Sequence, residues 1–187
     1  METAILTGLG LAAPAGLNAY IPLLALALAD RATTKVNLAA PYDALSSNAG
    51  IAILVILLTI EVAVDKVPGF DHVNDIVQSF IRPAAGAIVA LASTSGLVAV
   101  SPAIMVLLGV VLAGSVNAVK VTTRPAVTVG TGGILNPFVS MAEDGIAALA
   151  SIIAIFVPIL VLLVLAMFAV SSILLLRRFR RLRVGQG

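Results

Sequence analysis

The stretch A-G-I-A-I-L-V-I-L-L-T-I-E-V-A-V-D, residues 49–65, decides the fold class of this chain. It contains no charged residue before Glu61, which lies about one helical turn from its end. A helix needs about 20 mostly apolar residues to cross the roughly 30 Å hydrocarbon core of a bilayer. Residues 49–64 come close to that length and predict a membrane-spanning helix with an acidic side chain near one end.

The composition of the whole chain also favours a membrane protein. Of its 187 residues, 60% are hydrophobic and 11% are charged, whereas soluble domains carry about 25% charged residues. A water-soluble fold of this size could not cover its surface. The absence of Cys excludes disulfides, thiolate metal sites and cysteine nucleophiles. We therefore predict an all-α protein, a polytopic transmembrane helical bundle with about five spans.

Two of the predicted spans contain helix-breaking residues. The first includes Pro14 and Gly16, so we expect a short broken or re-entrant piece before residues 21–29 continue as helix. The third is interrupted by Arg82 and Pro83, and it could either span the bilayer or dip into it. The five predicted spans cover residues 4–29, 49–64, 76–95, 97–119 and 146–176.

Two stretches nearer the C-terminus are less regular. Residues 146–176 are longer than a bilayer core requires, so this span should tilt, kink near Pro158 or project beyond the membrane. Residues 121–144 are rich in Thr, Gly and Pro, which makes them too polar to face lipid and too apolar for an ordinary aqueous loop. Because non-helical backbone at membrane depth needs protein or water around it, we favour a Gly/Pro-rich re-entrant or cavity-lining segment; an extended loop packed on the bundle surface is the alternative.

The C-terminal tail is the most basic part of the chain. Lys and Arg beside a hydrophobic helix mark the cytoplasmic flank and attract anionic lipid headgroups. We therefore expect residues 1–176 to form a single transmembrane domain and residues 177–187 a basic cytoplasmic tail. With five spans the N-terminus would lie outside, and Arg31 and Lys35 inside. The arginines of the tail are Arg177, Arg178, Arg180, Arg181 and Arg183.

The predicted location follows from the spans and the tail. We expect a multi-pass protein of the bacterial cytoplasmic (inner) membrane with a cytoplasmic C-terminus. Its partners would be the lipid bilayer and, at the basic tail, anionic lipid headgroups. We expect no nucleic-acid partner, and the sequence leaves a homo-oligomer open.

Glu61 is the most informative single residue, because an ionisable group inside a span is costly unless it has a partner or reaches water. Asp65 lies four residues later on the same helical face, so the two carboxylates would repel unless a cation lies between them or one is protonated. Lys66, Lys120 or Arg82 could supply that cation. The pattern indicates a proton or cation site, or alternatively an interfacial pair that is salt-bridged to a neighbouring helix.

Asp71, His72 and Asp75 are weaker candidates, for a metal site. Together with Asp65 they place oxygen ligands beside the only histidine of the chain, and hard divalent cations prefer such ligands. The acidic residues could instead lie at a helix start, where carboxylates complement the helix dipole. Because the spacing matches no metal signature, we predict no metal, no cofactor and no enzymatic activity.

A second polar constellation flanks the Gly-rich segment. We expect Ser140 to be an N-cap three residues before Glu143, the spacing of a capping box. Two short patterns also recur: L-N at Asn18 and Asn136, and R-P at positions 82 and 124; they could reflect internal symmetry or chance. Asn18 is a further transport or ion-site candidate outside this constellation, whose remaining candidates are Asn117, Lys120, Arg124, Asn136, Glu143 and Asp144.

Four sequence strings carry a family resemblance. They are P-A-G-L-N-A-Y at 14–20, E-V-A-V-D-K-V-P-G-F-D at 61–71, R-P-A-A-G at 82–86 and N-P-F-V-S-M-A-E-D at 136–144. With these strings the chain resembles the bacterial integral membrane family catalogued as domain of unknown function 4126. The resemblance implies a polytopic membrane protein, and it implies no activity or catalytic residues.

Three functions remain compatible with the sequence. A small transporter or channel-like protein fits an intramembrane carboxylate at Glu61 and the Gly-rich segment. A structural or partner-binding membrane subunit fits the small-residue face from Gly109 to Gly114, which favours close helix packing. A lipid-modifying enzyme would have to rely on the acidic residues near His72, and we weigh it least.

Overall fold

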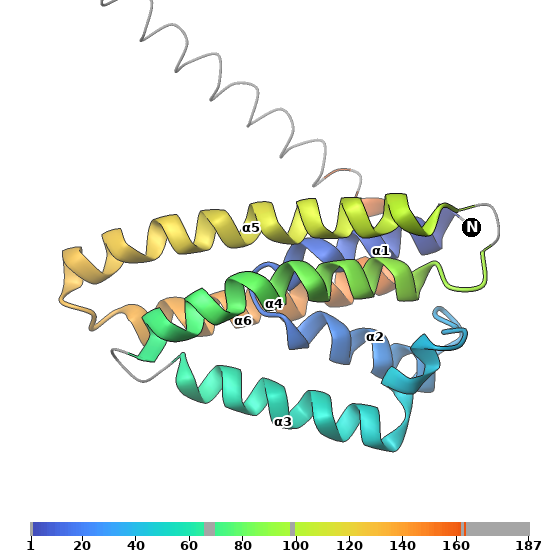
Figure 1. Cartoon of the computed structure of the whole chain (residues 1–187), viewed down its shortest axis with the longest axis horizontal. Helices are drawn as coiled ribbons and strands as arrows, with labels where there is room; N and C mark the ends of the chain where they lie inside the picture. The colour runs from blue at the N-terminus through green and yellow to red at the C-terminus, as the bar shows by residue number, and fades with distance from the viewer. Residues whose placement is uncertain (1, 66–69, 98–99, 162, 164–187) are drawn as a thin grey trace, which may run out of the picture.

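The computed structural model describes residues 2–65, 70–97, 100–161 and 163, and every regular element in these ranges is a helix (Figure 1). This confirms the predicted all-α helical fold. The helices are α1 (Glu2–Ala15), α2 (Tyr20–Ala32), the short 3-10 helix η1 (Tyr42–Ser46), α3 (Asn48–Val64), α4 (Phe70–Ser93), α5 (Pro102–Thr131) and α6 (Asn136–Phe156).

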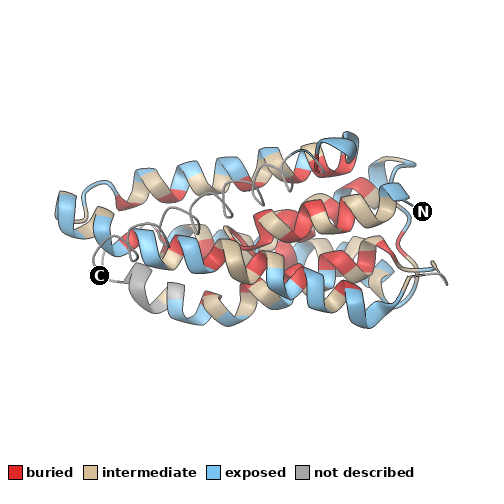
Figure 2. Ribbon diagram, turned by 90° about the horizontal axis from the view of Figure 1, so that it is seen from above, coloured by how far each residue is buried: buried red, intermediate tan, exposed pale blue. Residues whose placement is uncertain are grey.

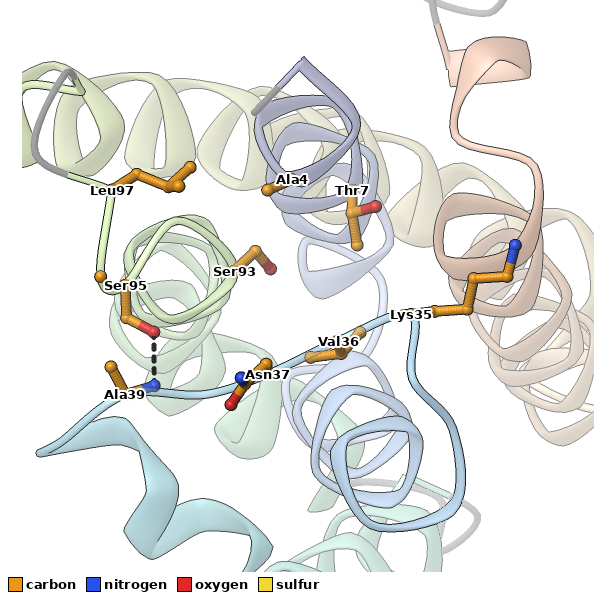
Figure 3. Close-up of a pocket in the computed structure, with 10 residues that line it drawn as sticks. Ala4, Thr7, Lys35, Val36, Asn37, Ala39, Ser93, Ser95 and Leu97 are labelled. Atoms are coloured by element: carbon orange, nitrogen blue, oxygen red, sulfur yellow. Dashed lines mark hydrogen bonds between the residues drawn. The ribbon is translucent and has the colours of Figure 1, made fainter.

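Helices α1 and α2 form a re-entrant pair. They enter from one end of the bundle, break near its middle and return, so that Thr7 of α1 and Lys35 after α2 line the same pocket (Figures 1 and 3). The break follows Pro14: the amides of Leu17 and Asn18 both donate to the Pro14 carbonyl, which closes α1. The predicted break is confirmed. However, residues 4–29 do not cross the bundle, so the prediction that the N-terminus lies opposite the Lys35 loop is wrong.

Helices α3 to α6 run alternately between the two ends of the bundle (Figure 1). The most extensive packing joins α4 and α5. At their crossing a Cβ atom on Gly109 would collide with the backbone oxygen of Gly86, and one on Gly86 would lie 2.6 Å from the oxygen of Gly109. Close approach of two helix backbones therefore depends on these two glycines.

Within the described residues, three helices are long and apolar enough to cross a membrane: α4 from Ile76 to Ser93, α5 and α6. Helix α3 is a shorter apolar helix of 17 residues. Five spans are therefore not confirmed. The third predicted segment is not interrupted at Pro83, because α4 is one continuous helix of 24 residues that contains this proline.

The prediction of an irregular re-entrant segment at residues 121–144 is wrong. Helix α5 continues to Thr131, a short turn covers 132–135, and α6 begins at Asn136. The threonines do not require irregular backbone, because their hydroxyls donate to carbonyls one turn earlier in the helix. These bonds join Thr122 to Ala118, Thr123 to Val119, Thr128 to Arg124 and Thr131 to Val127.

Glycines end helix α5. Gly132 and Gly133 have φ values of 62° and 81°, a left-handed conformation that glycine adopts without a Cβ clash, and the amides of both donate to the Thr128 carbonyl. Helix α6 then starts ten residues before the predicted span and ends at Phe156, next to Pro158. The helix is thus interrupted near Pro158, where the sequence allowed a kink, and residues 164–187, which hold the rest of this predicted span and the basic tail, lie outside the described residues.

The side chains divide into a lipid-like exterior and a small interior. Figure 2 shows the buried residues gathered on the helix faces that point toward one another, with exposed residues along the outer faces. Many exposed residues are large and apolar, which is the expected surface of a bundle surrounded by lipid. Examples are Ile56, Phe80, Leu107, Val111 and Leu149.

Candidate functional site

Ionised side chains meet in the interior near the break between α1 and α2. We call this cluster the ion network; it joins three carboxylates to three cations from four helices. Five of its members are at most 6% exposed, so the network lies in protein rather than in lipid or bulk water. Its members are Glu61 and Asp65 at the end of α3, Arg82 of α4, Lys120 and Arg124 of α5, and Glu143 of α6.

Glu61 and Arg82 form the first arm of the network. The Arg82 Nη2 atom lies 3.3 Å from Glu61 Oε1, and Nη1 donates to Asn117 Oδ1 at 2.9 Å. Asn117 in turn donates to the Ser79 hydroxyl at 3.2 Å, which ties α5 back to α4. Arg82 is fully buried, so its charge is compensated only by groups inside the bundle.

The other oxygen of Glu61 lacks a donor. Glu61 is 2% exposed, and its Oε2 atom has no hydrogen-bond partner among the described residues. A buried carboxylate oxygen normally accepts at least one hydrogen bond, and an exception calls for a physical explanation such as a bound water, ion or proton. Glu61 therefore differs from the carboxylates around it.

Asp65 holds four elements together. Its Oδ2 atom lies 3.3 Å from Arg124 and accepts a hydrogen bond from Ser140 at 3.1 Å, and its Oδ1 accepts one from Asn74 at 2.6 Å. Lys120 Nζ lies 3.8 Å from the same Oδ2. With both oxygens bonded, Asp65 is the more fully satisfied of the two α3 carboxylates.

Lys120 links the network to the helix break. Its Nζ atom donates to the backbone carbonyl of Leu17 at 2.8 Å and lies 3.0 Å from Glu143 Oε2. Gly16 makes this contact possible, because a Cβ atom there would collide with the Ala113 carbonyl of α5. The Leu17 carbonyl, which follows the end of α1, thus accepts a hydrogen bond from the buried Lys120 ammonium group.

The two asparagines of the recurring L-N pattern have local structural roles. Asn18 accepts hydrogen bonds from the amides of Tyr20 and Ile21, which caps α2, and it donates to Asp144 Oδ1 at 2.9 Å. Asn136 begins α6 and exchanges hydrogen bonds with Thr128 at the end of α5. Both asparagines lie at a helix start, but Asn18 caps its helix whereas Asn136 bonds back to α5; a global symmetry stays a prediction.

The structure separates several residues that the sequence suggested together. Among the described residues Glu61 and Asp65 do not share one ion-pair partner: Arg82 pairs with Glu61, and Arg124 pairs with Asp65 and, at 2.8 Å, with Glu143. The capping box is wrong, because Ser140 lies inside α6 and its hydroxyl donates to Asp65.

The metal candidates receive no structural support. Asp71, His72 and Asp75 lie in the first turns of α4, but their side chains, and the whole of Lys66, are outside the described part of the structure. Among the side chains that are described, no three His, Asp or Glu residues could hold a metal ion together.

Sequence reasoning missed Asn74 and Gln78 of α4. Together with Arg82, which it did identify, they recur at intervals of four residues and place one polar stripe along the first half of the helix. This spacing was a readable signal. The role of the Leu17 carbonyl was not, because a backbone oxygen leaves no mark in the sequence.

Comparison with known proteins gives one family match. Residues 5–178 match the family described as a domain of unknown function, DUF4126. No curated protein and no solved structure matches the chain. Since the match covers nearly the whole chain, the protein belongs to the DUF4126 family.

Proposed function

We propose that this protein is a small membrane transporter in which Glu61 carries a proton. The observation that supports this function best is the Glu61 Oε2 atom, which is buried and accepts no hydrogen bond from the part of the chain that the structure describes. A carboxylate with a permanent structural role would be expected to have both oxygens satisfied, as Asp65 has. An oxygen that lacks a donor can bind a proton at no cost in existing hydrogen bonds.

The surroundings of Glu61 fit a proton site that responds to a second ligand. Its carboxylate faces Asp65 of the same helix, Tyr20 of α2, Arg82 of α4 and Lys120 of α5. Protonation would remove the Glu61 charge from beside the Arg82 guanidinium, which also donates to the Asn117 amide oxygen. Such a change alters the balance of charge next to the helix break, and broken helices near mid-membrane commonly form transport sites.

A structural membrane subunit remains the second candidate function. It is favoured by the Glu61–Arg82 ion pair, because fixing the register of two helices can be the sole role of a buried ion pair. The close α4–α5 packing at Gly109 fits that function equally well. In this case the protein would move no solute, and loss of the Glu61 charge would affect stability alone.

Position in the membrane is part of the same proposal. We infer that the protein lies in a bacterial inner membrane with a cytoplasmic C-terminus, and that its basic tail contacts anionic lipid. Arg31 and Lys35 lie at the end of the bundle where α1 begins. Because cytoplasmic loops carry an excess of Lys and Arg, we expect this end of the bundle to face the cytoplasm as well.

The test is transport in reconstituted vesicles with a pH gradient. The wild-type protein should dissipate the gradient, alone or in the presence of one of a panel of cations and small solutes, and Glu61→Gln should not. The control is Asp43→Asn, which removes an exposed carboxylate of η1 and should behave as wild type. If all three proteins are inactive across the panel while Glu61→Gln alone lowers thermal stability, the structural function replaces the transport function.

A further inference from the structure

An apolar groove runs along the outer face of the re-entrant pair. Leu24 and Leu28 of α2 lie in its lining together with Leu58 of α3, and Ile152 and Phe156 of α6. Its volume is about 500 Å³, within the range of about 300–1,000 Å³ that is usual for small-molecule sites. The groove exists because α2 packs against both α3 and α6.

The groove has the depth of one bilayer leaflet. Its lining extends along α2 from Ile21, at the break in the middle of the bundle, to Ala32 at the end of the helix. Eleven residue steps of 1.5 Å give about 16 Å, and half of the roughly 30 Å hydrocarbon core is about 15 Å. An acyl chain that enters from one membrane face would therefore fill the groove and end at the helix break.

Two cations lie at the mouth of the groove. A second pocket, which shares Ala32 and Phe156 with the first, is also lined by Arg31 and Lys35. Figure 3 shows the Lys35 side chain leaving the loop toward the last turns of α6. Arg31 donates to the neutral Asn48 side chain at 2.8 Å, and neither cation has an ion pair within the described part of the chain.

The carboxylate of the neighbouring residue Asp30 bonds to the loop. Asp30 Oδ1 accepts a hydrogen bond from the Leu38 amide at 2.8 Å, which holds it against the loop. The mouth thus offers two cationic donors at the depth where lipid headgroups lie. We propose that this groove binds one anionic phospholipid, with an acyl chain along α2 and the phosphate at Arg31 and Lys35.

The proposal is tested with a photoactivatable phosphatidylglycerol and its phosphatidylcholine analogue, incorporated with the full-length protein into vesicles. Cross-links should map to the peptides of α2 and the end of α6, and phosphatidylglycerol should be preferred. Each Lys or Arg near the membrane surface contributes about 1 kcal/mol to anionic lipid binding. The double variant Arg31→Gln, Lys35→Gln should therefore weaken phosphatidylglycerol binding about 30-fold and leave phosphatidylcholine unchanged.

Matched variants separate the groove from other lipid contacts. Ala25→Phe fills the groove and should reduce cross-linking of both lipids, whereas Ala118→Phe adds the same ring to the exposed face of α5 and should not. Neutralising Arg177 and Arg178 in the tail should leave the α2 cross-links intact. Equal labelling by both lipids, or labelling that Ala25→Phe and the double variant do not change, would overturn the proposal. So would cross-linking of the chain's own residues 164–187 to the groove.

Discussion

The strongest stability prediction concerns the Glu61–Arg82 pair. Arg82→Met keeps most of the side-chain volume but, in alkaline buffer where Glu61 is ionised, leaves the Glu61 charge buried without its one hydrogen-bond donor among the described residues. Removing one partner of a buried ion pair costs about 3–5 kcal/mol, so we expect a loss of about 4 kcal/mol. Glu61→Gln should cost less, about 2 kcal/mol, because its amide oxygen still accepts from Arg82 and Arg82 still bonds to Asn117.

The double variant distinguishes an ion pair from two independent sites. With Glu61→Gln and Arg82→Met combined, no charge of this pair remains buried, so we expect a loss of about 3 kcal/mol instead of the additive value of about 6 kcal/mol. The resulting coupling energy is about 3 kcal/mol. It is measured by unfolding the four proteins with dodecyl sulfate in mixed micelles and following helix content by circular dichroism. Losses that add within about 0.5 kcal/mol would refute the pairing.

Two further predictions test the packing and the re-entrant pair. Gly109→Ala should lower the free energy of unfolding by about 1–3 kcal/mol, because its Cβ atom would meet the α4 backbone. In the control Gly114→Ala the new Cβ has no neighbour closer than 3.9 Å, so this change should be neutral or stabilise the protein by up to about 1 kcal/mol. Equal effects of the two substitutions would contradict the close α4–α5 crossing at Gly109. In this cysteine-free chain, Cys introduced at Thr3 and Lys35 should react with an impermeant reagent from the same membrane face and Cys at Ile134 from the opposite face, so labelling of the first two from opposite faces would exclude a re-entrant pair.

Hydrophobicity alone was enough to predict the fold class. The apolar run from Ile51 to Ile60 is best satisfied by a buried or lipid-facing helix. The predicted span, 49–64, agrees with the bounds of α3 within one residue. The break at Pro14 was also readable, because proline and glycine interrupt a helix by known backbone effects. Whether the chain then continued or returned was not readable, since both arrangements have the same local sequence.

In the Gly-rich segment, residues 121–144, the composition suggested irregular backbone where the structure has helix. Threonine was read as a polar residue that needs water or a loop, yet inside α5 its hydroxyl bonds to the helix carbonyls. Because each of these hydroxyl groups finds an acceptor one turn earlier in the same helix, the polar composition of the segment did not require the irregular backbone that we predicted from it. The actual end of the helix was marked by Gly132 and Gly133.

For the candidate site, the sequence identified the charged residues but not their partners. Glu61 and Asp65 share a helix face, as the four-residue spacing requires, but cations from α4 and α5 approach them at different places. Pairing depends on how helices that are distant in sequence cross. Here that crossing is set by small residues such as Gly86 and Gly16, whose close contacts only the folded chain reveals.

The central claim is that Glu61 takes up and releases a proton inside the membrane. Infrared difference spectroscopy of the reconstituted protein, stepped between mildly alkaline and acidic buffer, measures carboxyl protonation directly. We predict a protonated-carboxyl band that appears on acidification in the wild type and in Asp43→Asn, and that is absent in Glu61→Gln. A band that persists unchanged in Glu61→Gln, or a wild-type spectrum with no buried carboxyl that titrates, would contradict the account.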